Sequence, residues 1–220
     1  MTVASETPAR ARPRARPVIL EGRYVRLEPL TRGHARALSA AAGGPRETYA
    51  LTTVPEGESG ALGYIETALR DEEAGRSLPF ATVARSTGRV VGSTRFLNIE
   101  FWAWPPGHAL QRGEDVPDVA EIGATWLAGE AQRTAINTEA KLLMLTHAFE
   151  EWRVHRVSLM TDARNERSRT AILRVGARFD GVIRAHRPSS DGLIRDTAAF
   201  SILESEWPAV KRQLHSRLEP

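Results

Sequence analysis

The chain has 220 residues, 41% of them hydrophobic and 26% charged, a composition that suits one globular domain with a sizeable core. No apolar run approaches the roughly 20 residues that span a bilayer, and the first 17 residues lack the apolar core of a secretory signal. The absence of cysteine excludes disulfides, thiolate nucleophiles and sulfur-ligated metal. We therefore expect a cytoplasmic protein.

The formal charge of +3 and the pI of 9.8 come from one segment. Residues 1–17 hold four arginines and one acid, while the remainder carries equal numbers of basic and acidic residues. This segment alternates Arg with Pro and Ala, cannot bury apolar surface, and is predicted to be a disordered tail. Residues 18–220 are predicted to form a single domain. A neutral domain argues against a nucleic acid partner, which would have to bind the tail; a solubilising extension is the simpler interpretation.

The first half of the chain predicts a strand over 22–31, where apolar and polar residues alternate. A short helix follows from Thr31 to Ala42, and a second helix fits 59–75, where Leu62 and its neighbours recur at helical spacing. Next comes a β-hairpin, predicted from two apolar runs that flank a Ser-Thr-Gly turn, 79–85 and 89–99. Residues 101–118 hold two Trp, three Pro and two Gly and are predicted to form a long loop.

The second half predicts four strands and three helices. The strands cover 119–127, 155–161, 177–183 and 194–203. The helices cover 137–152, which has a wide apolar face, 165–176, which ends at Gly176, and 204–218 at the C-terminus. The complete order predicts an α+β domain with a mixed sheet.

The strand over 119–127 and the longest helix are joined by GEAQRTAINTEAK, residues 129–141. A strand that leads into a helix N-terminus presents free backbone N–H groups and the positive end of the macrodipole, and both favour phosphate. Small residues let several amides approach a pyrophosphate, and Arg133 adds a cation for a phosphate oxygen. The alternative is an ordinary capped helix, with Asn137 or Thr138 as the N-cap.

These elements, in this order, resemble the GNAT superfamily of acyl-CoA-dependent N-acyltransferases, and most closely its ribosomal-protein N-terminal acetyltransferase branch. The resemblance covers about residues 18–203. The pyrophosphate signature of the family is Gln/Arg-x-x-Gly-x-Gly/Ala, which falls here on Gln132, Arg133, Thr134, Ala135, Ile136 and Asn137, with Thr138 following. A second family anchor, Asn-x-x-Ser, falls on Asn165 and Ser168; Asn165 can cap the helix that begins there and also hydrogen-bond the pantetheine. Ala135 replaces a glycine, which would strain the loop only if φ were positive there.

The resemblance implies a GNAT-like α+β fold, with a mixed, mostly antiparallel sheet flanked by helices. Acyl-CoA would bind at a splayed central strand pair, where the backbone of Trp126, Leu127 and Ala128 would face the pantetheine. Acetyl-CoA or another acyl-CoA would be the co-substrate, with no metal. The acyl group would pass directly to a primary amine of a small molecule, an amino acid or a protein N-terminus, since no cysteinyl intermediate can form.

Such a transfer needs a neutral amine, a polarised carbonyl and a proton for the leaving thiolate. The resemblance makes Glu121 the candidate base; the alternative is a surface or ion-paired carboxylate. It makes Ser168 the candidate acid, because the chain's tyrosines all lie early in the sequence; the alternative is a first-turn serine that satisfies backbone donors. Trp102 and His108 are candidates for lining the acceptor pocket, unless the Trp residues simply pack under the long loop.

Two other functions stay open: a non-catalytic CoA-binding module of the same fold, and a nucleic-acid-associated protein acting through its tail. The six histidines show no metal-ligand spacing. The C-terminal helix or a sheet edge could pair two subunits into a homodimer. The sequence does not identify the acceptor.

Overall fold

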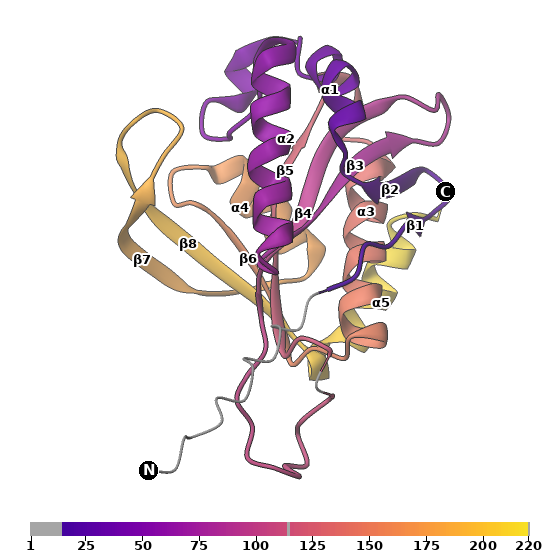
Figure 1. Ribbon diagram of the computed structural model, residues 1–220, viewed down its shortest axis with the longest axis vertical. Helices are drawn as coiled ribbons and strands as arrows, with labels where there is room; N and C mark the ends of the chain where they lie inside the picture. Colours follow the sequence, from indigo (N-terminus) through magenta and orange to yellow (C-terminus); the bar gives the residue numbers. More distant parts are fainter. Residues whose placement is uncertain (1–14, 114, 220) are drawn as a thin grey trace, which may run out of the picture.

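The computed structural model describes residues 15–113 and 115–219 (Figure 1). Most of the predicted tail, residues 1–14, therefore lies outside the described residues, and its predicted disorder is untested. No helix in the described part of the chain is both long and apolar enough to cross a bilayer.

A single eight-stranded sheet organises the fold, in the order β1-β2-β3-β4-β5-β6-β8-β7. Its strands are β1 (Leu20–Glu21), β2 (Val25–Pro29), β3 (Leu78–Ala84), β4 (Val90–Glu100), β5 (Val119–Leu127), β6 (Arg156–Asp162), β7 (Arg178–Pro188) and β8 (Ile194–Leu203). Neighbouring strands pair antiparallel, except β5 and β6, which are parallel. The predicted mixed, mostly antiparallel sheet is confirmed; the sequence analysis missed the short β1, which precedes the strand predicted over 22–31.

The α-helices are α1 (Ala35–Ala41), α2 (Gly57–Glu73), α3 (Ala135–Thr146), α4 (Glu166–Val175) and α5 (Trp207–Ser216). Two of them, α1 and α2, pack on one face of the sheet with a small core that includes Leu38, Ile65 and Trp126. The other three pack on the opposite face over the main core (Figure 1). Burial of each large core side chain, such as Phe80 or Phe96, stabilises the fold by about 1.5–3 kcal/mol.

The helix predicted over 137–152 begins two residues earlier, and its helical turns end one residue before the predicted end. The helix begins at Ala135, with Thr134 as its N-cap, and its last turn continues as a π-helix over His147–Glu151. The spacing in α2 was also misjudged, because Leu62 is exposed while Ala61, Ile65 and Ala68 are buried. Small alanines face the sheet there and let α2 approach it closely.

Candidate active site

The central strands β5 and β6 separate along their length. Their parallel pairing covers only Val119–Glu121 against Arg156–Ser158, although β5 continues to Leu127 and β6 to Asp162. A bulge in β5 next to this opening puts Ala124 at φ 47°, and bulges bend a strand away from its neighbour. The edge of β5 that faces β6 therefore has no strand partner beyond Glu121. This is the splayed strand pair that the family resemblance implied.

Glu121 lies where the opening begins, because its pair with Ser158 is the last between the two strands. The side chain is only 4% exposed, and Asn98 Nδ2 donates a hydrogen bond of 2.7 Å to its Oε2. Burial raises the pKa of Glu121, while the Asn98 amide and the charges of Arg187 and Arg195 lower it. The alternative of a surface carboxylate is therefore wrong. A buried, hydrogen-bonded carboxylate with a raised pKa has the properties of a general base.

The junction between β5 and α3 forms a capped helix N-terminus. Thr134 is extended (φ −107°, ψ 178°), and its hydroxyl accepts a hydrogen bond from the Ile136 N–H. Asn137 and Thr138 are thus inside the helix, and their assignment as N-cap was wrong. The left-handed residue of the loop is Arg133 (φ 60°) rather than Ala135, so alanine causes no strain in place of the family glycine.

One first-turn side chain of α3, Asn137, carries a buried oxygen without a partner in the described part of the chain. The Oδ1 atom of Asn137 is buried and makes no hydrogen bond with the residues that the structure describes. The amide of Ile136 is engaged by the Thr134 hydroxyl, while Arg133 is exposed beside the helix end. The helix end thus combines a positive dipole, an exposed guanidinium and a buried amide oxygen without a partner, and this set suits a ligand with both anionic and donor groups.

Part of the backbone that was expected to face pantetheine is already used by the protein. The carbonyl of Leu127 accepts hydrogen bonds from the Tyr49 hydroxyl and the Gln132 side chain, both at 2.9 Å. The Ala128 N–H donates to the Val91 carbonyl at 2.7 Å. The expectation for these groups therefore needs correction: the Leu127 carbonyl and the Ala128 amide are engaged at this junction.

Two tyrosines from the early part of the chain lie against β5. The Trp126 ring is buried between Tyr49 and Tyr64, each edge-on at 6.5 Å. The Tyr64 hydroxyl bonds the Ser93 hydroxyl at 3.3 Å and approaches the Ala124 carbonyl at 3.5 Å. The sequence analysis set these tyrosines aside because of their position, whereas the fold brings both hydroxyls to the splayed strand.

The second anchor begins α4, directly after β6. Asn165 is its N-cap, and Oδ1 accepts a hydrogen bond of 3.0 Å from the Ser168 N–H, as predicted. Asn165 thus satisfies the backbone N–H of Ser168, so the Ser168 hydroxyl is not needed as a cap. This half-buried hydroxyl makes no hydrogen bond among the described residues. The hydroxyl is chemically available, and its role as acid stays a prediction.

The structure does not bring Trp102 and His108 to Glu121. The loop that holds them lies beyond the N-terminal end of β5, opposite the α3 junction (Figure 1). Buried Asp118 accepts hydrogen bonds from the Trp102 N–H and the Trp104 indole, and His108 stacks on Trp104 at 4.6 Å. These rings support the base of the loop, which is the structural alternative weighed above.

Two charged residues of α3 were missed by the sequence analysis. Lys141 is 5% exposed, and its ammonium nitrogen donates to Thr125 Oγ1 at 2.7 Å; burial lowers its pKa to about 7. Glu139 is 6% exposed, and its carboxylate accepts hydrogen bonds from three successive backbone amides, Arg23 to Val25, at 2.6–2.8 Å. Lys141 supports β5 from behind the bulge, and Glu139 ties the β1–β2 turn to α3.

Comparison with known proteins agrees with this geometry. The model of the acetyltransferase (GNAT) domain matches residues 25–178, so the chain belongs to the GNAT family. A Bacillus subtilis (strain 168) protein, named as a candidate ribosomal N-acetyltransferase, YdaF, is 33% identical over 103 residues, which are 47% of this chain. The matched stretch spans about half, 55%, of that relative's length.

Many solved structures share the fold, and two of them illustrate the similarity. A GCN5-related N-acetyltransferase from Brucella melitensis superposes with a TM-score of 0.78 at 30% identity, covering 95% of this chain and 89% of that one. RimJ from Mycobacterium smegmatis, solved in complex with CoA-disulfide, has a TM-score of 0.70 at 21% identity, with 91% and 95% of the two chains covered. The second likeness supports the fold alone.

Proposed function

We propose that this protein is an acyl-CoA-dependent N-acyltransferase that passes an acyl group, acetyl in the first instance, directly to a primary amine. The observation that carries the proposal is the place where β5 and β6 stop pairing, because buried Glu121 lies at that point. The acceptor would be a small molecule, an amino acid or a protein N-terminus. The cytoplasmic location, the single domain over 18–220 and homodimer formation stay predictions.

The residues present fit an acyl-CoA. The first turn of α3 would hold the diphosphate through amides and the Arg133 guanidinium, and Asn137 Oδ1 would gain a partner. The β5 strand is about 20 Å long between Glu121 and Leu127. This is the distance, along one strand edge, between the proposed reacting centre at Glu121 and the diphosphate site that follows Leu127. The pantetheine arm joins those two ends of the coenzyme and would follow the edge that β6 leaves open.

In the proposed reaction the acceptor nitrogen bonds the thioester carbonyl carbon, the carbon–sulfur bond breaks, and one proton moves from nitrogen to sulfur. Glu121 would take the amine proton, directly or through water, since its raised pKa makes it a stronger base than an exposed carboxylate. The Ser168 hydroxyl would supply the proton for the leaving sulfur. Backbone donors of β5 would polarise the carbonyl.

Release of free CoA thiol from acetyl-CoA, measured with a panel of primary amines, tests the proposal. Glu121→Gln keeps the size of the side chain and removes the base, so we expect turnover to fall about a hundredfold to ten-thousandfold. Glu66→Gln, on the exposed side of α2, is the matched control. Binding of acetyl-CoA without thiol release for any amine would instead identify a non-catalytic CoA-binding module.

A further inference from the structure

Two arginines face each other on the β7–β8 hairpin. Arg187 and Arg195 are register partners across the two strands, so their side chains share one face. Like charges in this position repel and destabilise a strand pair. Neither guanidinium forms an ion pair with any carboxylate in residues 15–113 or 115–219, whereas neighbouring Arg164 forms two.

The same sheet face carries Glu121. Arg195 Nε donates to the hydroxyl of buried Thr197 at 3.0 Å, and Thr197 is the register partner of Asp162 in β6. Asp162 lies on the same face of β6 as Ser158, since side chains alternate along a strand, and Ser158 pairs with Glu121. The influence of both guanidinium groups on the Glu121 carboxylate, whose pKa they lower, agrees with this placement.

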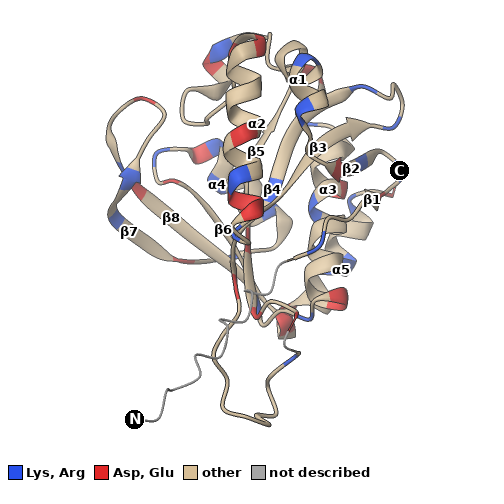
Figure 2. Ribbon diagram, in the orientation of Figure 1, with Lys and Arg blue, Asp and Glu red and all other residues tan. Residues whose placement is uncertain are grey.

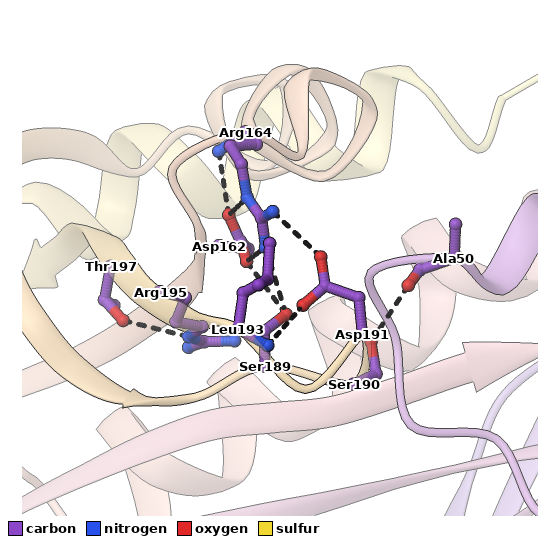
Figure 3. Close-up of polar contacts among 9 residues, drawn as sticks. All are labelled: Ala50, Asp162, Arg164, Ser189, Ser190, Asp191, Leu193, Arg195 and Thr197. Carbon is purple, nitrogen blue, oxygen red and sulfur yellow. Dashed lines mark hydrogen bonds and ion pairs between the residues drawn. The ribbon is translucent and has the colours of Figure 1, made fainter.

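Nearby carboxylates are already committed to other partners (Figure 3). Asp162 accepts hydrogen bonds from the backbone and guanidinium of Arg164 and from the Ser189 hydroxyl. Asp191 accepts from Arg164 Nη1 at 2.8 Å and from the Leu193 N–H at 3.1 Å. Both acids are bonded directly to Arg164, and neither forms an ion pair with Arg187 or Arg195, so the guanidinium groups of these two arginines keep donors for another anion.

The hairpin is held in place over the site. At its tip the Ser190 hydroxyl donates to the Ala50 carbonyl at 3.0 Å, which ties β7–β8 to the segment between α1 and α2 (Figure 3). Basic residues lie on both strands of the hairpin (Figure 2). A pair of guanidinium forks on one strand pair can bind a carboxylate or phosphate by several charge-assisted hydrogen bonds.

We propose that Arg187 and Arg195 bind an anionic group of the acceptor, so that the substrate is a small amine with a carboxylate or phosphate near its amino group. This inference rests on the proposed acyl transfer. The amine would point to Glu121 and the anion to the arginine pair. The bound anion would also relieve the repulsion between the two cations, which adds to its affinity.

Calorimetry with matched ligands tests this inference on the full chain, with and without CoA. Amino acids are compared with their carboxamides, and O-phosphoethanolamine with ethanolamine, so that the two arms separate a carboxylate from a phosphate. We expect the anionic member of at least one pair to bind about tenfold or more tightly. Arg187→Gln and Arg195→Gln should each abolish that preference. Arg178 lies at the start of β7, and its guanidinium pairs with Glu206, so Arg178→Gln should keep the preference.

Equal binding within every pair, no binding of any anionic probe, or a preference that survives both substitutions would overturn the inference. Failure of the acyl transfer itself is detected separately. Thiol release with neutral and anionic amines alike would leave the transferase intact and refute the arginine site. Absence of acetyl-CoA binding would refute the transferase, and the anion preference measured without CoA would still report on the arginines.

Discussion

Substitution of Lys141 by Met offers a quantitative test of how α3 supports β5. The ammonium group is enclosed by the protein, and its partners are the Thr125 and Thr94 hydroxyls at 2.7 and 3.4 Å. Burial lowers the pKa of Lys141 from an ordinary 10.5 to about 7. Between these values the unfolded chain binds a proton that the folded chain does not, so the free energy of unfolding rises with pH.

The size of the effect follows from that interval. Each pH unit between the two pKa values changes the free energy of unfolding by about 1.4 kcal/mol. Across the whole interval the free energy of unfolding therefore changes by about 5 kcal/mol. At about pH 7.5 the buried lysine lowers the free energy of unfolding by roughly 4 kcal/mol, compared with a side chain that is neutral in both the folded and the unfolded protein. Lys141→Met removes this cost and loses two hydrogen bonds of about 1 kcal/mol each. We therefore expect the variant to be about 2 kcal/mol more stable at that pH.

Urea unfolding of the two proteins between about pH 7.5 and pH 9.5 measures this difference. The stability of the variant relative to the wild type should fall by about 2.5 kcal/mol across that range, so that the two proteins become about equally stable near the upper pH, because the cost in the wild-type protein fades as the unfolded lysine loses its proton. Lys211→Met removes the chain's other lysine, which pairs with Glu150 on the surface, and serves as control. Parallel stability curves for wild type and Lys141→Met would refute the assignment of a buried, proton-free amine.

Four further predictions concern the β1–β2 turn, the catalytic face and the diphosphate site. Glu139→Gln should destabilise the fold by about 2–3 kcal/mol in urea unfolding, because charge-assisted bonds from three amides are lost. Gly22→Ala should cost about 1–3 kcal/mol, since its Cβ would clash with the Glu139 carboxylate; an unchanged midpoint would contradict this contact. Thiol release should increase as pH rises through a midpoint above 4.5, the ordinary Glu value, since Glu121 must lose its proton; a Glu121→Gln profile with the same acidic limb would exclude this base. Arg133→Glu should weaken the thermal protection by acetyl-CoA, and equal protection would remove Arg133 from the diphosphate site.

Local patterns in the sequence predicted most of the elements, because strand alternation and turn residues act over short distances. The β5 strand was predicted with the bounds that the structure shows, and the caps at Asn165 and Gly176 were identified from residue type. The start of α3 was misplaced because several residues in the same stretch can cap a helix. Only the extended backbone at Thr134 decides among them.

Contacts between distant segments could not be predicted from one sequence. Tyr49 reaches Leu127, and Arg195 reaches the face of Glu121, through strand register and helix packing that no local pattern encodes. Lys141 is a residue type usually found on the surface. It is buried against the sheet because it lies on the buried side of α3, together with Ala140 and Met144. The loop with Trp102 is a further example, since its hydrogen bonds to Asp118 were not foreseen, and its contact with an acceptor stays a prediction.

A crystal structure with bound acetyl-CoA tests the central claim most directly. The diphosphate should accept hydrogen bonds from first-turn amides of α3 and from Arg133, and the thioester should lie between β5 and β6 next to Glu121. A coenzyme bound elsewhere on the surface, with the β5–β6 opening filled by side chains, would contradict the proposed transferase site.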